Sequence, residues 1–217
     1  MTVTARRQPT TANLACTGRA HPLQPRSPGY ERGPSPWEAE HIRPLNRRQI
    51  DDRWQDLGDL YVETSVFQPW MSEQARDRFH RRLAADVRRP GFALLVAESE
   101  VLTGCAYGFP LCGEGPWRQS FDGYLPGNLA RPATSGRLFA ISGIVVRTEV
   151  RIRHQDQDWN LARRLQKRLL EDHGAALGVT LVSRADVETL RAFRSWGWRD
   201  IDDLLPPAPC HVLTLSP

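Results

Sequence analysis

The chain has 217 residues, of which 40% are hydrophobic, so it is long enough to bury a substantial core. Its formal net charge is +4, from 29 basic and 25 acidic residues, and the basic residues, nearly all arginine, are scattered along the chain. This scatter argues against a nucleic-acid platform, which needs clustered positive charge with interleaved aromatics. No run of about 18 apolar residues occurs, so we expect no membrane span.

The four cysteines indicate neither a metal site nor a disulfide framework. Cys16, Cys105, Cys112 and Cys210 form no CxxC pair and have no metal-ligand spacing. We therefore expect a protein of the reducing cytoplasm that is not exported and holds no metal.

The first 36 residues differ in composition from the rest. They carry Pro, Ser, Thr, Gly and Arg with very few aliphatic side chains, and such a composition cannot offset the entropy lost on ordering. We expect residues 1–36 to form a disordered tail and residues 37–217 to form one domain.

The first half of this domain begins with a strand over residues 38–45, which ends at a proline. Two helical patterns follow, one through Ile50, Trp54 and Leu57 and one through Phe79 and Leu83. Residues 91–109 then contain two short apolar stretches around a polar turn near residues 98–100, which predicts a β-hairpin.

Residues 110–137 are too long for a plain connection and are rich in Gly and Pro. Trp117, Phe121 and Tyr124 lie within them. These three aromatics either line an acceptor pocket or hold the loop against the domain.

The second half alternates strands and helices around a long polar loop between residues 146 and 160. The predicted elements are a strand over 138–146, a helix over 160–173, a strand over 178–183, a helix over 186–196 and a strand over 210–215. Leu161, Leu165 and Leu169 give the first of these helices an apolar face, and Gly174 predicts its end.

The step from strand 138–146 through a polar loop to a helix that begins at Asn160 is a pattern with chemical meaning. Free N–H groups and the helix dipole make the amino end of such a helix an anion site that suits a pyrophosphate. The same residues also fit an ordinary polar helix start.

Two short motifs resemble those of the GCN5-related N-acetyltransferases (GNAT family). The segment QDWNLA, residues 157–162, is similar to the family's coenzyme loop, which has Gln or Arg, two residues, Gly, one residue, then Gly or Ala. The segment AFRSWGW, residues 192–198, resembles a family signature of an aromatic, Gly and Phe. The predicted order of strands and helices over residues 38–215 is also that family's order.

The resemblance implies a mixed α/β (α+β) fold with a mostly antiparallel sheet of six to seven strands flanked by helices. It implies acetyl-CoA as co-substrate, an amine acceptor, and no metal. Main-chain groups of Ile144, Val145 and Val146 would contact the pantetheine. The implied coenzyme loop and helix start comprise Gln157, Asn160, Leu161, Ala162 and Arg163.

Two residues depart from the family pattern where acid–base chemistry is expected. Gly143 lies where part of the family has a glutamate general base, and Phe193 lies where a tyrosine often protonates the leaving thiolate. Ser142 and Tyr107 are the hydroxyl-bearing candidates for catalysis, although strand hydroxyls often only pack. We leave Trp196, Trp198 and His211 as structural residues.

Two hypotheses of different class remain open. The first is an N-acetyltransferase that moves acetyl from acetyl-CoA directly to a primary amine of a small molecule or peptide. The second is a GNAT-like acyl-CoA-binding or regulatory module that has lost turnover, which Gly143 and Phe193 favour. A homodimer is compatible with either hypothesis.

Overall fold

The computed structural model describes residues 41–64, 71–111, 127–153, 160–201 and 209–217. Within them a seven-stranded sheet has the order β1-β2-β3-β4-β5-β7-β6, and only the β4–β5 pair is parallel. The prediction of a mixed, mostly antiparallel sheet of six to seven strands flanked by helices is confirmed. The predicted boundary between residues 36 and 37 lies outside the described residues.

The strands and helices follow the predicted order with a few additions. The strands are β1 (His41–Pro44), β2 (Ala93–Glu98), β3 (Leu102–Leu111), β4 (Leu138–Val146), β5 (Leu177–Ser183), β6 (Arg199–Asp200) and β7 (Cys210–Leu215). The helices are α1 (Arg47–Asp52), α2 (Trp54–Thr64), α3 (Ser72–Val87), α5 (Gly127–Thr134), α6 (Thr148–Arg153), α7 (Leu161–Asp172) and α8 (Val187–Ser195).

Several additions correct the sequence prediction. Residues 110–137, predicted to be a long loop, contain the end of β3 and helix α5. The helical pattern through Ile50 and Trp54 is two helices, because the Arg53 N–H is shared between the carbonyls of Gln49 and Ile50 and the chain turns there. The stretch read as a polar loop after β4 contains α6, and β6 is a two-residue strand that pairs with β7.

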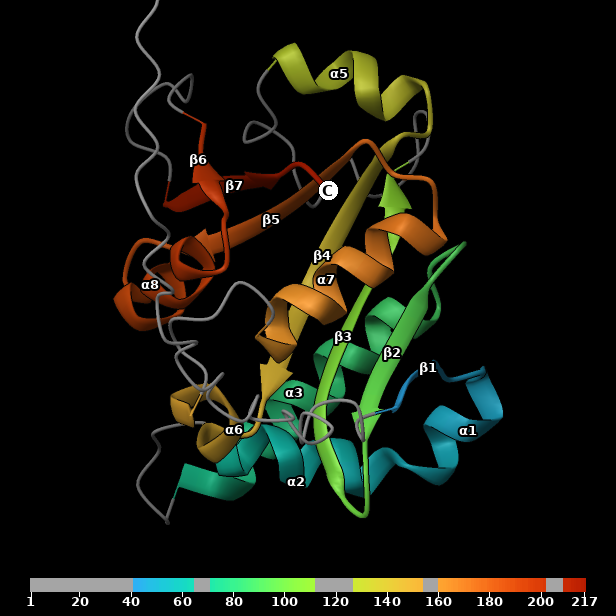
Figure 1. Ribbon diagram of the computed structural model, residues 1–217, viewed down its shortest axis with the longest axis vertical. Helices are drawn as coiled ribbons and strands as arrows, with labels where there is room; N and C mark the ends of the chain where they lie inside the picture. Colours follow the sequence, from blue (N-terminus) through green and yellow to red (C-terminus); the bar gives the residue numbers. More distant parts are fainter. Residues whose placement is uncertain (1–40, 65–70, 112–126, 154–159, 202–208) are drawn as a thin grey trace, which may run out of the picture. The chain divides into compact units, whose positions relative to one another are not determined.

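Helices cover both faces of the sheet (Figure 1). On one face α7 lies across β3 and β4, and Leu161, Leu165 and Leu169 pack there with Phe193 of α8. On the other face α2 and α3 pack against Tyr107 of β3 and its neighbours. The central strands β2, β3 and β4 alternate their side chains between these two apolar layers, as a sheet buried on both faces requires.

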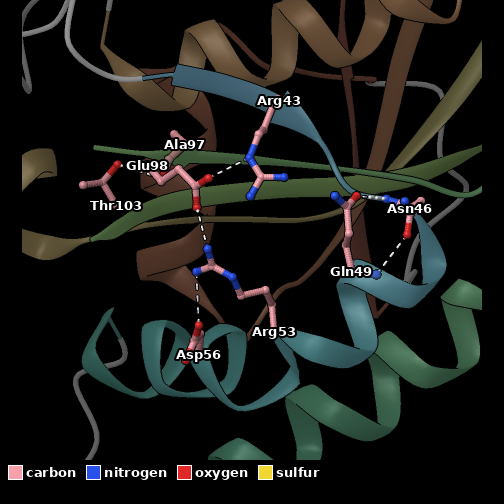
Figure 2. A network of polar contacts seen from close by, with 8 residues as sticks. All are labelled: Arg43, Asn46, Gln49, Arg53, Asp56, Ala97, Glu98 and Thr103. Atoms are coloured by element: carbon pink, nitrogen blue, oxygen red, sulfur yellow. Dashed lines mark hydrogen bonds and ion pairs between the residues drawn. The ribbon is translucent and has the colours of Figure 1, made fainter. Parts of the chain in front are cut away.

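The edge of the sheet is held by an ionic network around Glu98, at the end of β2 (Figure 2). Arg43 of β1 donates to Glu98 Oε1 at 2.6 Å, and Arg53 donates to Glu98 Oε2 at 3.3 Å. Arg53 also meets Asp56 at 3.2 Å. Glu98 thus ties β1 and the turn between α1 and α2 to the end of the hairpin.

The helix after the polar loop begins and ends as predicted. Asn160 is the N-cap of α7, and its side chain accepts a hydrogen bond from the Arg163 N–H at 2.9 Å. At the other end Gly174 has φ +57°, and the Ala175 N–H donates to the Leu170 carbonyl at 3.0 Å, as in a left-handed helix stop.

Candidate functional site

Strands β4 and β5 begin as neighbours and then separate. They pair only over Leu138–Ala140 of β4 and Leu177–Val179 of β5. Beyond Val179, β5 continues to pair with β7 up to Ser183, whereas β4 continues to pair with β3 up to Val146. Among the described residues, no strand follows the free edge of β4 from Ile141 onward (Figure 1).

This free edge presents main-chain polar groups. The Arg147 N–H donates to the Thr103 carbonyl of β3 at 2.9 Å. Because successive residues of a strand direct their N–H and C=O groups to opposite edges, the main-chain groups of Ile144 and Val146 face away from β3. They therefore point into the space between β4 and β5.

The strand β4 also bulges where this free edge begins. Tyr107 pairs with Gly143 and the next residue of β3, Gly108, pairs with Ile141, so Ser142 is the extra residue on β4. Bulges bend a strand and increase its local twist. The bulge at Ser142 lies where β4 leaves β5.

Two adjoining hollows lie in this space. The smaller has a volume of about 200 Å³ and reaches the amino end of α7. The larger, of about 480 Å³, reaches the end of α2 at Tyr61 and Thr64. We call the two together the β4–α8 groove. Residues lining both hollows are Val146, Arg151, Glu188, Ala192 and Trp196.

The amino end of α7 forms one wall of the groove. Asn160, Leu161 and Ala162 line the smaller hollow. The first N–H groups of a helix have no partner within the helix, and the helix dipole makes this end favourable for an anion. Asn160 has φ −56°, so the N-cap needs no glycine-like backbone here.

The end of α8 forms another part of the groove wall. Ser195 and Trp196 line the smaller hollow, and Arg163 of α7 donates from Nη2 to the Ser195 carbonyl at 2.9 Å. The Arg163 side chain, predicted to bind the coenzyme, therefore also holds α8 beside α7.

The charged side chains on the groove were not singled out as ligands by the sequence analysis. Arg151 of α6, and Glu188 and Arg191 of α8, line the smaller hollow. Arg151 lies on a helix that the sequence analysis read as loop. Arg191 reaches the groove because α8 packs beside α7. In the sequence, only the apolar spacing of Leu190 and Phe193 indicates which face of α8 is buried.

The predicted site residues on β4 come together, and the hydroxyl candidates lie apart from the lining. Ile144 and Val145 line the larger hollow, and Val146 lines both. Ser142 is partly buried at the bulge, and neither Ser142 nor Tyr107 belongs to the lining of the groove.

Tyr107 is packed in the core. It is 2% exposed and lies near the rings of Phe79 and Phe92. Burial is the main cause that raises the pKa of its hydroxyl well above the ordinary range. The phenol therefore stays neutral at physiological pH, it gives up its proton less readily than an exposed tyrosine, and it cannot act as a base.

Trp196 and Trp198, which were predicted to be structural, are buried, and so is Phe193 of α8. Phe193 is 6% exposed, with ring centroids 5.4 Å from Trp196 and 5.3 Å from Trp198. Trp196 is both a core residue and a lining residue of the groove, which the sequence analysis missed. His211 hydrogen-bonds through Nδ1 to Asp200 at 2.8 Å.

Four predicted site residues cannot be placed. Gln157 of the coenzyme loop and the aromatics Trp117, Phe121 and Tyr124 lie outside the described residues. Within the described part of the chain, no helix is long and apolar enough to cross a membrane. The same residues contain no group of three or more His, Cys, Asp or Glu side chains that could hold a metal ion.

Comparison with known proteins gives no match at the level of sequence. No family model matches the chain, and no curated protein matches it. Many solved structures nevertheless share its arrangement of strands and helices.

Three of these structures illustrate the likeness. The N-acetyltransferase PaiA from Thermoplasma acidophilum, solved with coenzyme A, is 11% identical, with a TM-score of 0.50 over 82% of this chain and 98% of its own. The GNAT domain of PAT from S. lividans is 12% identical, with a TM-score of 0.47 over 82% and 90%. AAC(6')-Ib, solved with ribostamycin and coenzyme A, is 13% identical, with a TM-score of 0.48 over 82% and 93%.

At such low sequence identity, structural likeness establishes an architecture and not an activity. The sheet order and the parting of β4 from β5, taken with the match to PaiA, identify the fold. The chain has the GNAT fold.

Proposed function

We propose that this protein is an N-acetyltransferase that moves the acetyl group of acetyl-CoA to a primary amine of a small molecule or peptide. The observation that carries the proposal is the β4–α8 groove, where a free strand edge and the amino end of α7 lie side by side. PaiA, which has the same fold, was solved with coenzyme A. A cytoplasmic location, where acetyl-CoA is available, is part of the proposal.

The two ends of the groove suit different parts of acetyl-CoA. The edge of β4 offers the main-chain groups of Ile144 and Val146 to the amides of the pantetheine arm, as an added strand would. The amino end of α7 at Asn160, with Arg151 and Arg191 nearby, suits the phosphates. The larger hollow, which reaches Tyr61 and Thr64, would then receive the amine acceptor.

Direct transfer requires few protein groups. The neutral amine attacks the thioester carbonyl, the C–N bond forms, and the C–S bond breaks as the amine proton goes to the thiolate or to water. Main-chain N–H groups of β4 would stabilise the oxyanion, and positioning of the two substrates would supply much of the rate. Of the two hydroxyl candidates, we propose that Ser142, at the bulge, relays a proton, because it is only partly buried whereas Tyr107 is packed in the core.

The aromatic residues predicted to contact the acceptor remain part of the proposal. Trp117, Phe121 and Tyr124 belong to the segment between β3 and α5, and we propose that they contribute to acceptor binding. Gln157 would belong to the phosphate-binding end, in the segment just before Asn160.

A second candidate function is a module that binds acyl-CoA without turnover. Gly143 provides no carboxylate on β4, and Phe193 is buried and has no proton to give. Both observations concern the chemical step and leave the coenzyme groove intact.

Calorimetric titration separates these functions from a fold without a ligand. We expect acetyl-CoA and desulfo-CoA to bind, and Arg151→Ala with Arg191→Ala to weaken both in a salt-dependent manner. A panel of primary amines then tests turnover by thiol release. Absence of binding would refute both functions, and binding without turnover of any amine would favour the module.

A further inference from the structure

Helix α7 carries a buried polar residue among its leucines. Gln166 is 3% exposed and follows the buried Leu165 along the helix. A buried amide is costly unless its hydrogen bonds are made. An apolar residue would avoid this cost, so the amide requires an explanation from its contacts.

Both ends of the Gln166 amide are used, and both partners belong to the segment after α8. Nε2 donates to the Trp196 carbonyl at 2.8 Å. Oε1 accepts from Nε1 of Trp198 at 2.8 Å. Gln166 therefore fixes the Trp196–Gly197–Trp198 turn against α7, and Gly197 at φ +99° gives that turn its shape.

A second side chain of α7 makes a parallel contact one turn earlier. Arg163 donates to the Ser195 carbonyl at 2.9 Å, so α7 binds two consecutive carbonyls at the carboxyl end of α8. The last carbonyls of a helix have no partner within the helix. Here α7 supplies donors for two of them, and the end of α8 is fixed to α7.

The residues that these two hydrogen bonds hold, Ser195 and Trp196, form part of the groove wall. Ser195 and Trp196 line the smaller hollow together with Asn160, Leu161 and Ala162 of α7. Gln166 itself does not line the groove, and neither does Trp198. The hydrogen bond between Gln166 and Trp196 therefore connects two elements that both line the groove.

We propose that Gln166 is a positioning residue for acetyl-CoA, acting through the Trp196 carbonyl to hold the α8 wall of the groove at the width the coenzyme needs. This inference rests on the proposed function. It predicts that loss of the Gln166–Trp196 hydrogen bond weakens coenzyme binding in a protein that is still folded.

The test compares two variants that each lose hydrogen bonds of the same buried cluster. Gln166→Met keeps the length of the side chain and removes both hydrogen bonds. Trp198→Phe removes the bond to Trp198 and leaves the bond to Trp196, so it is the matched control. Each variant is titrated calorimetrically with acetyl-CoA, and its melting temperature is recorded by circular dichroism.

We expect the Kd for acetyl-CoA to rise about fivefold or more in Gln166→Met, because a small displacement of a binding wall has a large effect. In Trp198→Phe the Kd should stay within about twofold of the wild type, although the melting temperature falls. Unchanged Kd in folded Gln166→Met, or equal weakening in both variants, would overturn the inference and leave the proposed function standing.

Two other outcomes also decide the matter. If Gln166→Met does not fold, Gln166→Leu is the second variant, and failure of both to fold would make Gln166 a core residue only and overturn the inference. Failure of the wild-type protein to bind acetyl-CoA would refute the proposed function, and this inference with it.

Discussion

The contact between Tyr107 and Gly143 shows how a single residue shapes the site. A Cβ atom at Gly143 would lie 2.8 Å from Cε1, Cζ and Oη of Tyr107, whose ring is packed beside Phe79 and Phe92. The tyrosine ring therefore occupies the space that any side chain at position 143 would need, including a glutamate.

We predict that Gly143→Ala lowers the free energy of unfolding by about 1–3 kcal/mol, because the ring has little room to move. Urea unfolding measures the loss. The control is the same substitution in a Tyr107→Leu background, where the obstacle is gone and the added cost should be much smaller. An equal loss of unfolding free energy in the two backgrounds would show that the Tyr107 ring can move aside without cost.

A buried thiol predicts how stability changes at alkaline pH. Burial raises the pKa of Cys105 from 9.0 to about 12. In the folded protein the thiol stays protonated, whereas in the unfolded chain it ionises above pH 9, so ionisation favours unfolding. Its contribution to stability is complete below pH 9 and is lost as the pH rises toward 12, at up to on the order of 1 kcal/mol per pH unit.

Urea unfolding between pH 8 and pH 11 measures this slope. Cys105→Ala removes the thiol and should reduce the slope, while Tyr107, whose pKa burial also raises, still contributes above pH 10. Identical slopes with and without the thiol would contradict the assignment.

At the scale of an element, the start of α7 allows stability and ligand binding to be separated. The Asn160 side chain caps the Arg163 N–H, and an aspartate can make the same hydrogen bond. Asn160→Asp should keep the melting temperature, since a carboxylate at a helix start is favourable. It should weaken acetyl-CoA binding several-fold, because it places a negative charge beside the proposed phosphate site.

Asn160→Ser is the matched neutral control, which we expect to keep both stability and affinity. Asn160→Ala should lose about 1 kcal/mol of stability through the missing cap. Unaltered affinity in a folded Asn160→Asp protein would place the phosphates elsewhere.

The elements that the sequence predicted best carry strong local signals. The bounds of α7 follow from the leucine spacing, the cap at Asn160 and the stop at Gly174. The elements that the sequence did not predict carry weak local signals. Helix α6 has six residues, and β6 has two residues that form a strand only because β7 lies beside them.

At the scale of the whole molecule, the groove could not be predicted from local patterns. The sequence of β4 predicts a strand over its full length, which is correct, but it does not tell where its neighbour departs. That depends on β7, a strand from much further along the chain, which pairs with β5 over Gly178–Ser183. Only the family resemblance predicted that main-chain groups of β4 would be available for a ligand.

Residues 1–36 contain six prolines and few aliphatic residues, which give them little to contribute to a core. A protein of residues 37–217 should melt within a couple of degrees of the full chain, which corresponds to under about 1 kcal/mol. Its control is a protein of residues 45–217, which also lacks β1.

This longer deletion removes the pairing of β1 with β2 and the ion pair between Arg43 and Glu98. It leaves the partly buried Glu98 with Arg53 alone and exposes the edge of β2. We therefore expect the melting temperature to fall clearly for residues 45–217 and not for residues 37–217, as measured by circular dichroism. A similarly large fall in melting temperature from both deletions would show that residues 1–36 contribute to the folded domain, and the predicted boundary would be wrong.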